Sequence, residues 1–525
     1  MGVIGSAPRR DERELRLADL LASLSLVADL GFGLPPDEAM RSCLIATTLA
    51  RRLGLSETEI SDIFYATLLE HVGCNGFSHE AAGAFGDELV ANAAAARTNV
   101  ADTRDGFLTF LPAVTRGRPL LARARVVFFT MTSGADFDRR FAAAACEVGR
   151  ATARRLGLRD SIQRALDEVF EAWNGKGGPR GLRGDAIALA SRFARLGATV
   201  ARFDSIGGGP LAVRAVQQRA GGLLDPELCS AFVAQAEEII SAVSADDPPV
   251  AVLAAEPDPP VSIQVARLAE VAAAFGDIAD LKSPYMHGHS SGVARLARGA
   301  GASLGLDPDP LDRLHVAGLL HDLGRVAISD AIWESPSAPT TAEWEQIRLH
   351  PYHSERILAR SAVLGPMAEI VGMHHERLDG SGYHRGSKSR DLSPSTRVLA
   401  VADAYQAMTQ ARAYRAALSP EQAADAVHAD ARAGKLDGDA VAAVLDTAGQ
   451  ARPRLRPERP AGLSEREIEV LRVMAQGLSN AEIGRRFSIS PRTAEHHVQH
   501  IYTKIGVSSR AAAALFAMEH DLLDR

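Results

Sequence analysis

Histidines and carboxylates recur through the second half of the chain at positions where the surrounding pattern is apolar. His321 and Asp322 stand in the middle of "LHVAGLLHDLGR" (314–325), whose leucine, valine and alanine residues predict a buried helix. A polar group in such a place is costly unless it is paired or bound to a ligand. Residues of the same two kinds lie on either side of this dipeptide, at His289, His350, His374, His375 and Asp403.

The mixture of imidazole and carboxylate groups indicates which ions such a site would bind. These ligands together suit iron, manganese or zinc better than calcium. A carboxylate such as Asp322 can bridge two ions about 3.5–4 Å apart, an arrangement used in phosphoester hydrolysis. We therefore predict two divalent transition-metal ions, with iron or manganese favoured and zinc as a further candidate. The alternative is a hydrogen bond between His321 and Asp322 in an ordinary core, which would be the better interpretation of an isolated dipeptide.

Four motifs extend this pattern over residues 263–450: "HDLGR", "HP", "HHERLDGSGYH" and "VADAYQAMTQARAYR". In their order and spacing they resemble the HD-GYP subgroup of the HD phosphohydrolases. The resemblance implies an all-helical module that holds two or three metal ions and hydrolyses cyclic di-GMP. It further implies metal ligands at His289, His321, Asp322, His350, His374, His375 and Asp403, catalytic roles for Asp322 and Arg325, and nucleotide binding by Arg325, Arg412 and Arg415.

Three positions depart from the family pattern. His384 replaces the proline of the GYP motif, and Gln406 stands where an acidic residue often contacts the guanine edge. Tyr285 stands where some members have a glutamate that binds a third metal ion, so we predict two ions in this chain. The motifs thus support a metal pair more directly than they support one particular nucleotide.

The first half of the chain repeats the pattern. "RLADLLASLSLVADL" (16–30) aligns with "RLAEVAAAFGDIADL" (267–281) at an offset of 251, and "EAWNGKGGPRG" (171–181) aligns with "ERLDGSGYHRG" (376–386) at an offset of 205. The difference between the offsets places an insertion of 46 residues between Cys74 and about Ala145 of the first copy.

Nearly all of the ligands are absent from this first copy. The seven positions that match the predicted ligands hold Glu38, Glu70, His71, Ala145, Val169, Phe170 and Ala198. We therefore interpret the first copy as a pseudo-enzyme, kept for regulation, ligand sensing or pairing with the second copy. Cys74 and Cys146, with Glu70 and His71, could instead form a redox or soft-metal sensor. We favour the simpler interpretation, in which small residues fill a vacated cavity.

A short helical unit follows at the C-terminal end. Apolar residues recur at helical spacing before Gly477, "NAEIGRRF" (480–487) predicts a second helix, and Pro491 starts a third. Residues 463–517 resemble the LuxR-type DNA-binding domain, with a helix-turn-helix whose recognition helix runs from about Pro491 to Lys504. The resemblance implies a dimer that binds DNA through Arg492, Thr493, Glu495, His496, Gln499 and Lys504. The alternative is a helical hairpin that only docks proteins.

The composition supports helices throughout. Hydrophobic residues make up 46% of the chain but aromatic residues only 5%, so alanine, leucine and valine must fill the cores. We predict an all-α protein with two tandem HD-type modules and a small four-helix C-terminal domain. The predicted domains are 1–245, a degenerate HD-GYP-like module with an insertion around 75–145; 246–262, a proline-rich linker; 263–450, the metal-binding module; 451–460, a second linker; and 461–525, the DNA-binding domain.

Charge and cysteine content limit the location of the protein and its partners. The net charge of −7 argues against a protein that coats nucleic acid with its whole surface. Four cysteines without paired spacing fit a reducing cytosol. No uncharged apolar run is long enough to span a bilayer, so we expect a soluble, cytoplasmic protein without a membrane partner.

These observations lead to three hypotheses of function. The first is a one-component transcription regulator whose HD-GYP module binds or hydrolyses a cyclic dinucleotide, cyclic di-GMP favoured, and so controls DNA binding. The second is a phosphodiesterase with secondary DNA binding. The third is a transcription factor whose inactive HD-GYP module is only a receptor or a dimer scaffold. The seven intact ligand positions oppose the third hypothesis, and the intact recognition helix opposes the second.

Overall fold

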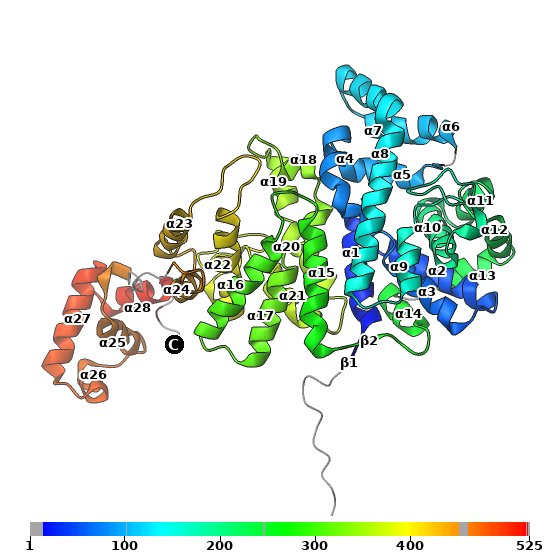
Figure 1. Cartoon of the computed structure of the whole chain (residues 1–525). Helices are drawn as coiled ribbons and strands as arrows, with labels where there is room; N and C mark the ends of the chain where they lie inside the picture. Colours follow the sequence, from blue (N-terminus) through cyan, green and yellow to red (C-terminus); the bar gives the residue numbers. More distant parts are fainter. Residues whose placement is uncertain (1–13, 101, 245–246, 451–459, 521, 523–525) are drawn as a thin grey trace, which may run out of the picture. The chain divides into compact units, whose positions relative to one another are not determined.

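The computed structural model describes residues 14–100, 102–244, 247–450, 460–520 and 522 (Figure 1). Most of these residues lie in helices, which confirms the all-α prediction. Two short strands, β1 (Glu14–Arg16) and β2 (Ser262–Gln264), pair antiparallel. The chain divides into two compact units, residues 1–452 and 453–525. The first unit holds both predicted modules.

Within the described residues, thirteen α-helices and the turn η2 make up most of the first module. They are α1 (Leu17–Gly31), α2 (Glu38–Arg52), α3 (Glu57–Leu68), η2 (Cys74–Phe77), α4 (Ser78–Phe85), α5 (Glu88–Arg97), α6 (Thr103–Asp105), α7 (Leu111–Thr115), α8 (Leu120–Arg155), α9 (Asp160–Asp167), α10 (Leu189–Gly207), α11 (Gly209–Arg219), α12 (Pro226–Val233) and α13 (Ala236–Ser244). The stretch in which we predicted the insertion contains α4 to α7 and the N-terminal part of α8.

The second module repeats the central helices of the first. Its elements are α15 (Leu268–Asp280), α16 (His289–Ser303), α17 (Pro308–Leu320), η6 (Leu323–Ala327), α18 (Asp330–Trp333), α19 (Thr341–Ile347), α20 (His350–Leu358), α21 (Gly365–Gly372), α22 (Pro394–Met408), α23 (Pro420–Arg432) and α24 (Gly438–Thr447). The apolar residues of both modules join in one continuous core.

Equivalent hydrogen bonds hold equivalent helices in the two modules. The Asp29 carboxylate accepts from the backbone N–H of Ala39, at 3.2 Å, at the start of α2. The Asp280 carboxylate accepts from the backbone N–H of Ser290, at 2.9 Å, at the start of α16. Both residues of the second pair lie 251 positions after their counterparts. The helices that begin with Glu38 and His289 are therefore fixed in the same way.

A second shared contact explains why the glycine-rich passage is present in both copies. The Glu171 carboxylate accepts hydrogen bonds from backbone N–H groups nine and eleven residues further on, each at 2.8 Å. Glu376 accepts from groups at the same spacing, at 2.7 and 3.0 Å. The repeated letters therefore encode a loop that folds back on a buried carboxylate, and this loop needs no metal ion.

The prediction of a linker at 246–262 is wrong for much of that segment. Residues Pro248–Ala255 form helix α14, which lies against α1 and α2. Pro248 and Pro249 stand in its first turn, where no backbone N–H is needed, so they start the helix instead of preventing it. The Tyr65 hydroxyl donates to the Glu256 carboxylate at 2.5 Å and fixes the end of the segment. Of the second predicted linker, 451–460, only Pro460 lies within the described residues.

The C-terminal unit has the four helices that the sequence predicts. They are α25 (Glu465–Ala475), α26 (Asn480–Phe487), α27 (Pro491–Ile505) and α28 (Arg510–Glu519). Ser464 and Ser479 begin α25 and α26 with capping boxes, in which serine and a glutamate three residues later satisfy free backbone N–H groups. Across the described part of both units, no helix combines the length and apolar character needed to cross a membrane.

Docking of α14 on the first module can be tested with two valines of the same helix. Val252 is fully buried, whereas Val250 is 62% exposed. Val252→Ala should lower the free energy of unfolding by about 2 kcal/mol, because it removes buried apolar surface and leaves a cavity. Val250→Ala should change it by less than about 0.5 kcal/mol. Urea denaturation measures both values, and equal effects would show that α14 does not dock as described.

Candidate metal centre

Five short stretches of the second module bring the predicted ligands together. His289 begins α16, His321 and Asp322 follow α17, His350 begins α20, His374 and His375 follow α21, and Asp403 lies in α22. Six of the seven side chains are buried, and that of His375 is 19% exposed. Their ligand atoms form two groups, one of His289, His321 and Asp322 and one of His350, His374 and His375.

The Asp322 carboxylate lies between the histidines of the first group and those of the second. Its Oδ2 is 3.8 Å from Nε2 of His289 and 3.7 Å from Nε2 of His321. Its Oδ1 is 3.3 Å from Nε2 of His350 and 3.7 Å from Nε2 of His374. Each oxygen therefore faces one group of histidines, as a bridging ligand of two ions must.

Asp403 completes the set from the other side. Its Oδ1 lies 3.3 Å from Nε2 of His289 and 3.7 Å from Nε2 of His321. Its Oδ2 lies 3.7 Å from Nδ1 of His375. Both groups thus contain imidazole nitrogens and at least one carboxylate oxygen within reach.

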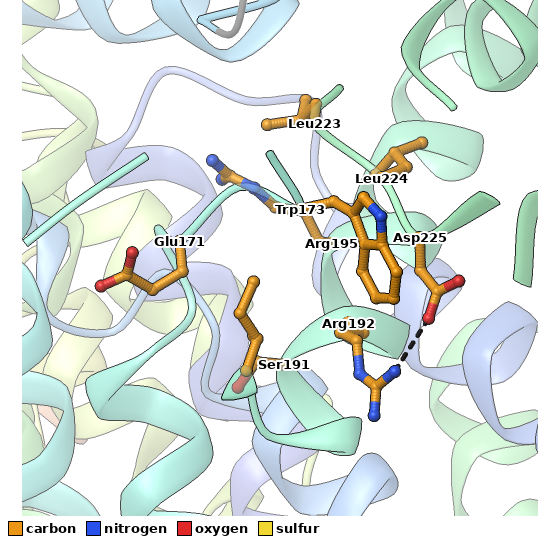
Figure 2. A pocket seen from close by; sticks show the side chains of 9 residues that line it. Glu171, Trp173, Ser191, Arg192, Arg195, Leu223, Leu224 and Asp225 are labelled. Carbon is orange, nitrogen blue, oxygen red and sulfur yellow. Dashed lines mark hydrogen bonds and ion pairs between the residues drawn. The ribbon is translucent and has the colours of Figure 1, made fainter. Parts of the chain in front are cut away.

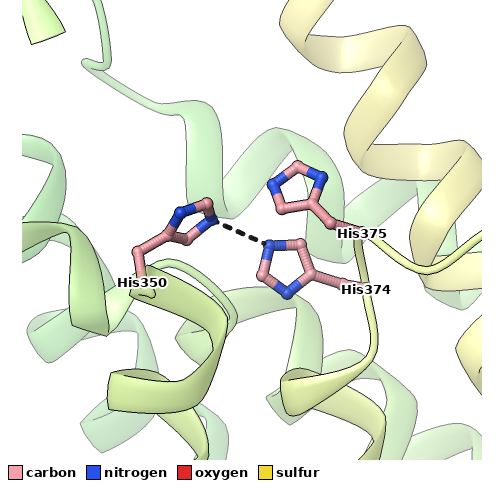
Figure 3. A group of neighbouring side chains, drawn as sticks. All are labelled: His350, His374 and His375. Atoms are coloured by element: carbon pink, nitrogen blue, oxygen red, sulfur yellow. Dashed lines mark hydrogen bonds between the residues drawn. The ribbon is translucent and has the colours of Figure 1, made fainter. Parts of the chain in front are cut away.

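Backbone carbonyls fix which nitrogen of three histidines faces the site. In His321, His350 and His374 the Nδ1–H donates to the carbonyl three residues earlier, at 2.9, 2.7 and 2.6 Å. A carbonyl only accepts, so in the neutral ring Nε2 carries a lone pair. Nε2 of His350 and Nε2 of His374 are 3.4 Å apart (Figure 3). Two lone pairs at this distance repel unless a proton or a metal ion lies between them.

The electrostatics of the site favour cations. Burial opposes ionisation of Asp322, but His321 and Arg325 hold its pKa well below the usual value. Burial lowers the pKa of His374 to about 3, so its ring is neutral. Burial acts on His321 in the same direction, yet the two carboxylates raise its pKa to about 9. Nε2 of His321 therefore lies where positive charge is favoured, and a metal ion can supply that charge instead of a proton.

Two buried atoms of this cluster have no hydrogen-bond partner among the described residues: His321 Nε2 and Asp322 Oδ1. Polar atoms without partners are rare in protein cores and require an explanation. His321 Nε2 lies 3.7 Å from Asp322 Oδ2, and Asp322 Oδ1 lies on the side of His350 and His374. The donor set, five imidazoles and two carboxylates, fits a pair of divalent transition-metal ions.

Two of the three predicted nucleotide-binding arginines lie at this centre. The Arg325 guanidinium covers the ring of Trp333 at 3.7 Å, and its Nε is 3.6 Å from Asp322 Oδ2. Arg412 donates to the backbone carbonyl of Tyr285 at 2.8 Å. Burial, followed by the charge of Arg325, lowers the pKa of Arg412 to about 10. An anion near both guanidinium groups would relieve their repulsion.

Arg415 makes backbone contacts that the sequence did not predict. Its guanidinium donates to four backbone carbonyls, those of Ala407, Met408, Gln410 and Ala416, at 2.7 to 3.3 Å. These contacts satisfy carbonyl groups at the C-terminal end of α22 and in the loop after it. Arg415 therefore holds the loop that follows Asp403, and its donors are occupied in this structure.

Three neighbours of the ligands escaped the sequence analysis. The Oε1 atom of Gln410 lies 2.8 Å from Nδ1 of His289 and orients that ring. Tyr383 stacks on His375, with ring centroids 4.7 Å apart. Trp333 contacts both Arg325 and His350. The sequence offers only a weak signal for them, because each acts through a contact that depends on the folded loops.

The matching place in the first module contains charged groups of a different kind. Arg202 of α10 pairs with Glu38 at the position of His289, and both side chains are buried. Arg195, also from α10, lies 5.5 Å from the ring of Phe170, the counterpart of His375. Figure 2 shows Arg195 among the residues of a small adjacent pocket, where Arg192 pairs with Asp225 at 3.0 Å. Arginines thus supply the positive charge here.

The two cysteines of this region are buried thiols. Burial raises the pKa of Cys146 to about 12 and that of Cys74 well above its usual value. A thiolate is the reactive form of cysteine, so these values disfavour redox or metal chemistry at physiological pH. They agree with the interpretation that small residues fill a vacated cavity.

The C-terminal unit exposes the predicted recognition helix, α27. Ala494, Val498 and Ile501 face its core, while all six predicted DNA contacts are exposed. Lys504 is also bound within the domain, because its ammonium donates to the Glu467 carboxylate at 2.7 Å. Although burial acts in the opposite direction, Lys504 and Ser464 lower the pKa of Glu467 to about 2.

Residues 273–440 match the HD domain family, and residues 461–517 match the luxR family of bacterial regulatory proteins. The chain joins an HD domain to a LuxR-type domain. Both resemblances drawn from the sequence motifs are thereby confirmed. The HD match contains all seven predicted ligands, and the LuxR-type match contains the whole of α27.

Relatives of known activity extend this comparison. 3′3′-cGAMP-specific phosphodiesterase 3 of Vibrio cholerae is 29% identical over 411 residues, which cover 78% of this chain and 89% of that protein. A cyclic di-GMP phosphodiesterase of Thermotoga maritima is 35% identical over 150 residues, 28% of this chain and 41% of that protein. The crystal structure of a cyclic GMP-AMP-specific phosphodiesterase of V. cholerae covers 84% of this chain and 99% of its own, with a TM-score of 0.58 and 26% identity. The longer matches exceed the HD domain and so include much of the first module.

Metal analysis of purified variants tests the assignment of the ligands. The HD domain should hold about two transition-metal ions per chain, in line with a two-metal site. Asp322→Ala and His321→Ala should each lose most of this metal, because Asp322 faces both groups and His321 lies beside it. Glu70→Ala and His71→Ala change the matching positions of the first module and should leave the metal content unchanged. A full complement of metal in Asp322→Ala would contradict the assignment.

Proposed function

We propose that this protein is a one-component transcription regulator, in which the HD domain hydrolyses a cyclic dinucleotide and the LuxR-type domain binds DNA. The observation that carries the enzymatic half is the position of Asp322, with one oxygen toward each histidine group and Arg325 beside it. The regulatory half rests on the exposed recognition helix. We place the protein in the cytoplasm, where it would meet both DNA and nucleotide.

The residues of the centre have distinct roles in this proposal. Two bound divalent ions would lower the pKa of a water molecule and neutralise charge on the phosphate. Asp322 and Asp403 hold the ligand set together, and the backbone carbonyls keep the histidine rings in the orientation that binding requires. Arg325 and Arg412 attract the phosphodiester. Arg325 is already oriented by the Trp333 ring, so little side-chain freedom is lost when the substrate binds.

For the substrate we favour 3′3′-cyclic GMP-AMP over cyclic di-GMP, the nucleotide that the sequence motifs alone favour. The V. cholerae relative that covers 78% of this chain is named a 3′3′-cGAMP-specific phosphodiesterase. Gln406 supports the choice, since it lies one turn beyond Asp403 in α22. An amide both donates and accepts and can pair with adenine N6 and N7, whereas a carboxylate only accepts.

Turnover assays with both nucleotides test this proposal. With manganese or iron supplied, the protein should hydrolyse 3′3′-cyclic GMP-AMP faster than cyclic di-GMP. Asp322→Asn should abolish turnover, and Gln406→Glu should shift the ratio of kcat/KM toward cyclic di-GMP by about tenfold, the value of one good base contact. Binding without turnover under every metal would make the HD domain a receptor. An absence of binding would leave it a dimer scaffold.

DNA binding should respond to the nucleotide if the two domains are coupled. A ligand shifts the protein between two arrangements only by its difference in affinity for them, and the effect is reciprocal. Residues 451–459 of the second predicted linker, which join the two domains, lie outside the described residues. We expect nucleotide to change operator affinity by about 5- to 150-fold, measured with the Asp322→Asn protein by fluorescence anisotropy.

Variants of the recognition helix provide the controls for that measurement. Arg492→Ala should weaken operator binding about tenfold or more and leave nucleotide affinity without DNA unchanged. Lys504→Ala should also lower the melting temperature, because Glu467 loses its partner. Arg432 is an exposed residue of the HD domain, and Arg432→Ala should change neither operator affinity nor nucleotide affinity. Equal operator affinities with and without nucleotide would mean that two independent functions share one chain.

A further inference from the structure

The short helix α18 supports the arginine that faces the metal centre. Trp333, its last residue, lies beneath the Arg325 guanidinium at 3.7 Å and touches the His350 ring, with centroids 5.6 Å apart. Four residues cannot hold a helix in place by themselves, because a single turn is costly to form. Whatever fixes α18 therefore also fixes Arg325.

The N-terminal end of α18 is held by a residue of the first module. Glu88, the first residue of α5, is fully buried. Its Oε1 accepts from the backbone N–H of Asp330 at 2.9 Å, and its Oε2 accepts from the Ser329 hydroxyl at 2.8 Å. The Lys282 ammonium donates to Glu88 Oε1 and to the carbonyl of Val326, both at 2.9 Å. Glu88 thus satisfies the start of α18 as a capping residue would.

The C-terminal end of α18 is held by the same part of the first module. Nδ1 of His79, in α4, lies 2.6 Å from Oε2 of Glu334, the residue that follows α18. The Ser283 hydroxyl donates to the other oxygen of Glu334 at 2.6 Å. Figure 1 shows α4 beside α18, and the two helices are in contact.

We propose that the insertion of the first module positions Arg325 for its phosphate through α18, with Glu88 as the main positioning residue and His79 as the second. Glu88 and His79 both lie in the stretch of the first module that contains the insertion, so the catalytic copy does not supply these contacts itself. The role of Arg325 rests on the proposed function, whereas the anchoring of α18 by Glu88 and His79 rests on the contacts alone. In this proposal the first module contributes to the metal centre by holding α18, and through it Arg325, in position.

Glu88→Gln and His79→Ala test the proposal in the full-length, metal-loaded protein, with Glu80→Gln as the control. Glu80 is an exposed neighbour of His79 in α4. Glu88→Gln should lower kcat/KM by about 10- to 100-fold, chiefly through KM, because a small displacement of a positioning group has an effect of this order. His79→Ala should act in the same direction but less, and metal content should not change in any variant.

Fluorescence of Trp333 gives a readout that does not depend on activity. In a Trp173→Phe/Trp344→Phe background Trp333 is the single tryptophan of the chain. Glu88→Gln should increase its quenching by acrylamide at least twofold, because α18 is released, and Glu80→Gln should not. A merely structural Glu88 would lower the melting temperature but leave both KM and Trp333 quenching of the folded protein unchanged.

The outcomes separate this proposal from the proposed function. Wild-type KM and quenching in Glu88→Gln would overturn the positioning role even if the protein is an active phosphodiesterase. If the wild-type protein hydrolyses no cyclic dinucleotide, the proposed function fails, and Trp333 quenching alone decides whether the insertion holds α18. If Glu88→Gln does not fold, His79→Ala replaces it, because the His79 side chain is half-exposed. KM and Trp333 quenching of that variant then test the proposal.

Discussion

The second module depends on one constraint, which is that two carboxylates are ionised inside a helical core. Asp322 and Asp403 lie among apolar helices and keep pKa values far below normal. Buried anions are tolerated only when positive charge and hydrogen bonds compensate the loss of water. The histidines cannot all supply that charge, because burial keeps rings such as His374 neutral. The two carboxylates therefore favour cations at this place, and the position of Asp322 between the two sets of histidines supports the proposed pair of ions.

The first module meets the same constraint without imidazole ligands. The first module keeps the Asp29 contact and the loop around Glu171. At the place that matches the metal centre, however, arginine side chains supply the positive charge. Glu38 pairs with Arg202, and burial raises the pKa of Glu70 to about 8, so that it is largely protonated at neutral pH. A guanidinium group occupies space that a ligand would need. Restoring histidines alone would therefore not restore a metal centre.

Sequence reasoning identified features that local motifs set and missed features that distant contacts set. The clustering of the seven candidate ligands could be predicted because each motif fixes residue type and spacing, and α26 and α27 could be predicted from "NAEIGRRF" and Pro491. The backbone contacts of Arg415 and the contact of Lys504 with Glu467 could not be predicted, since long side chains reach partners that only the fold defines. Helix α14 was missed because proline discourages helices in general but not in their first turn. Glu88 gave no signal, because the insertion has no counterpart in the repeat.

The contacts between the modules explain why an erased copy is retained beside an intact one. The Glu88–Lys282 pair is almost completely buried, with exposed fractions of 0% and 3% for the two side chains. Removing the first module would leave the Lys282 ammonium without its carboxylate and the start of α18 without the Glu88 carboxylate that binds Ser329 and Asp330, in addition to exposing the shared core. A charge stranded in this way is strongly destabilising. The second module therefore depends on the first through this buried pair and through the contacts of Glu88 with the start of α18, and neither contact requires a metal ion in the first module.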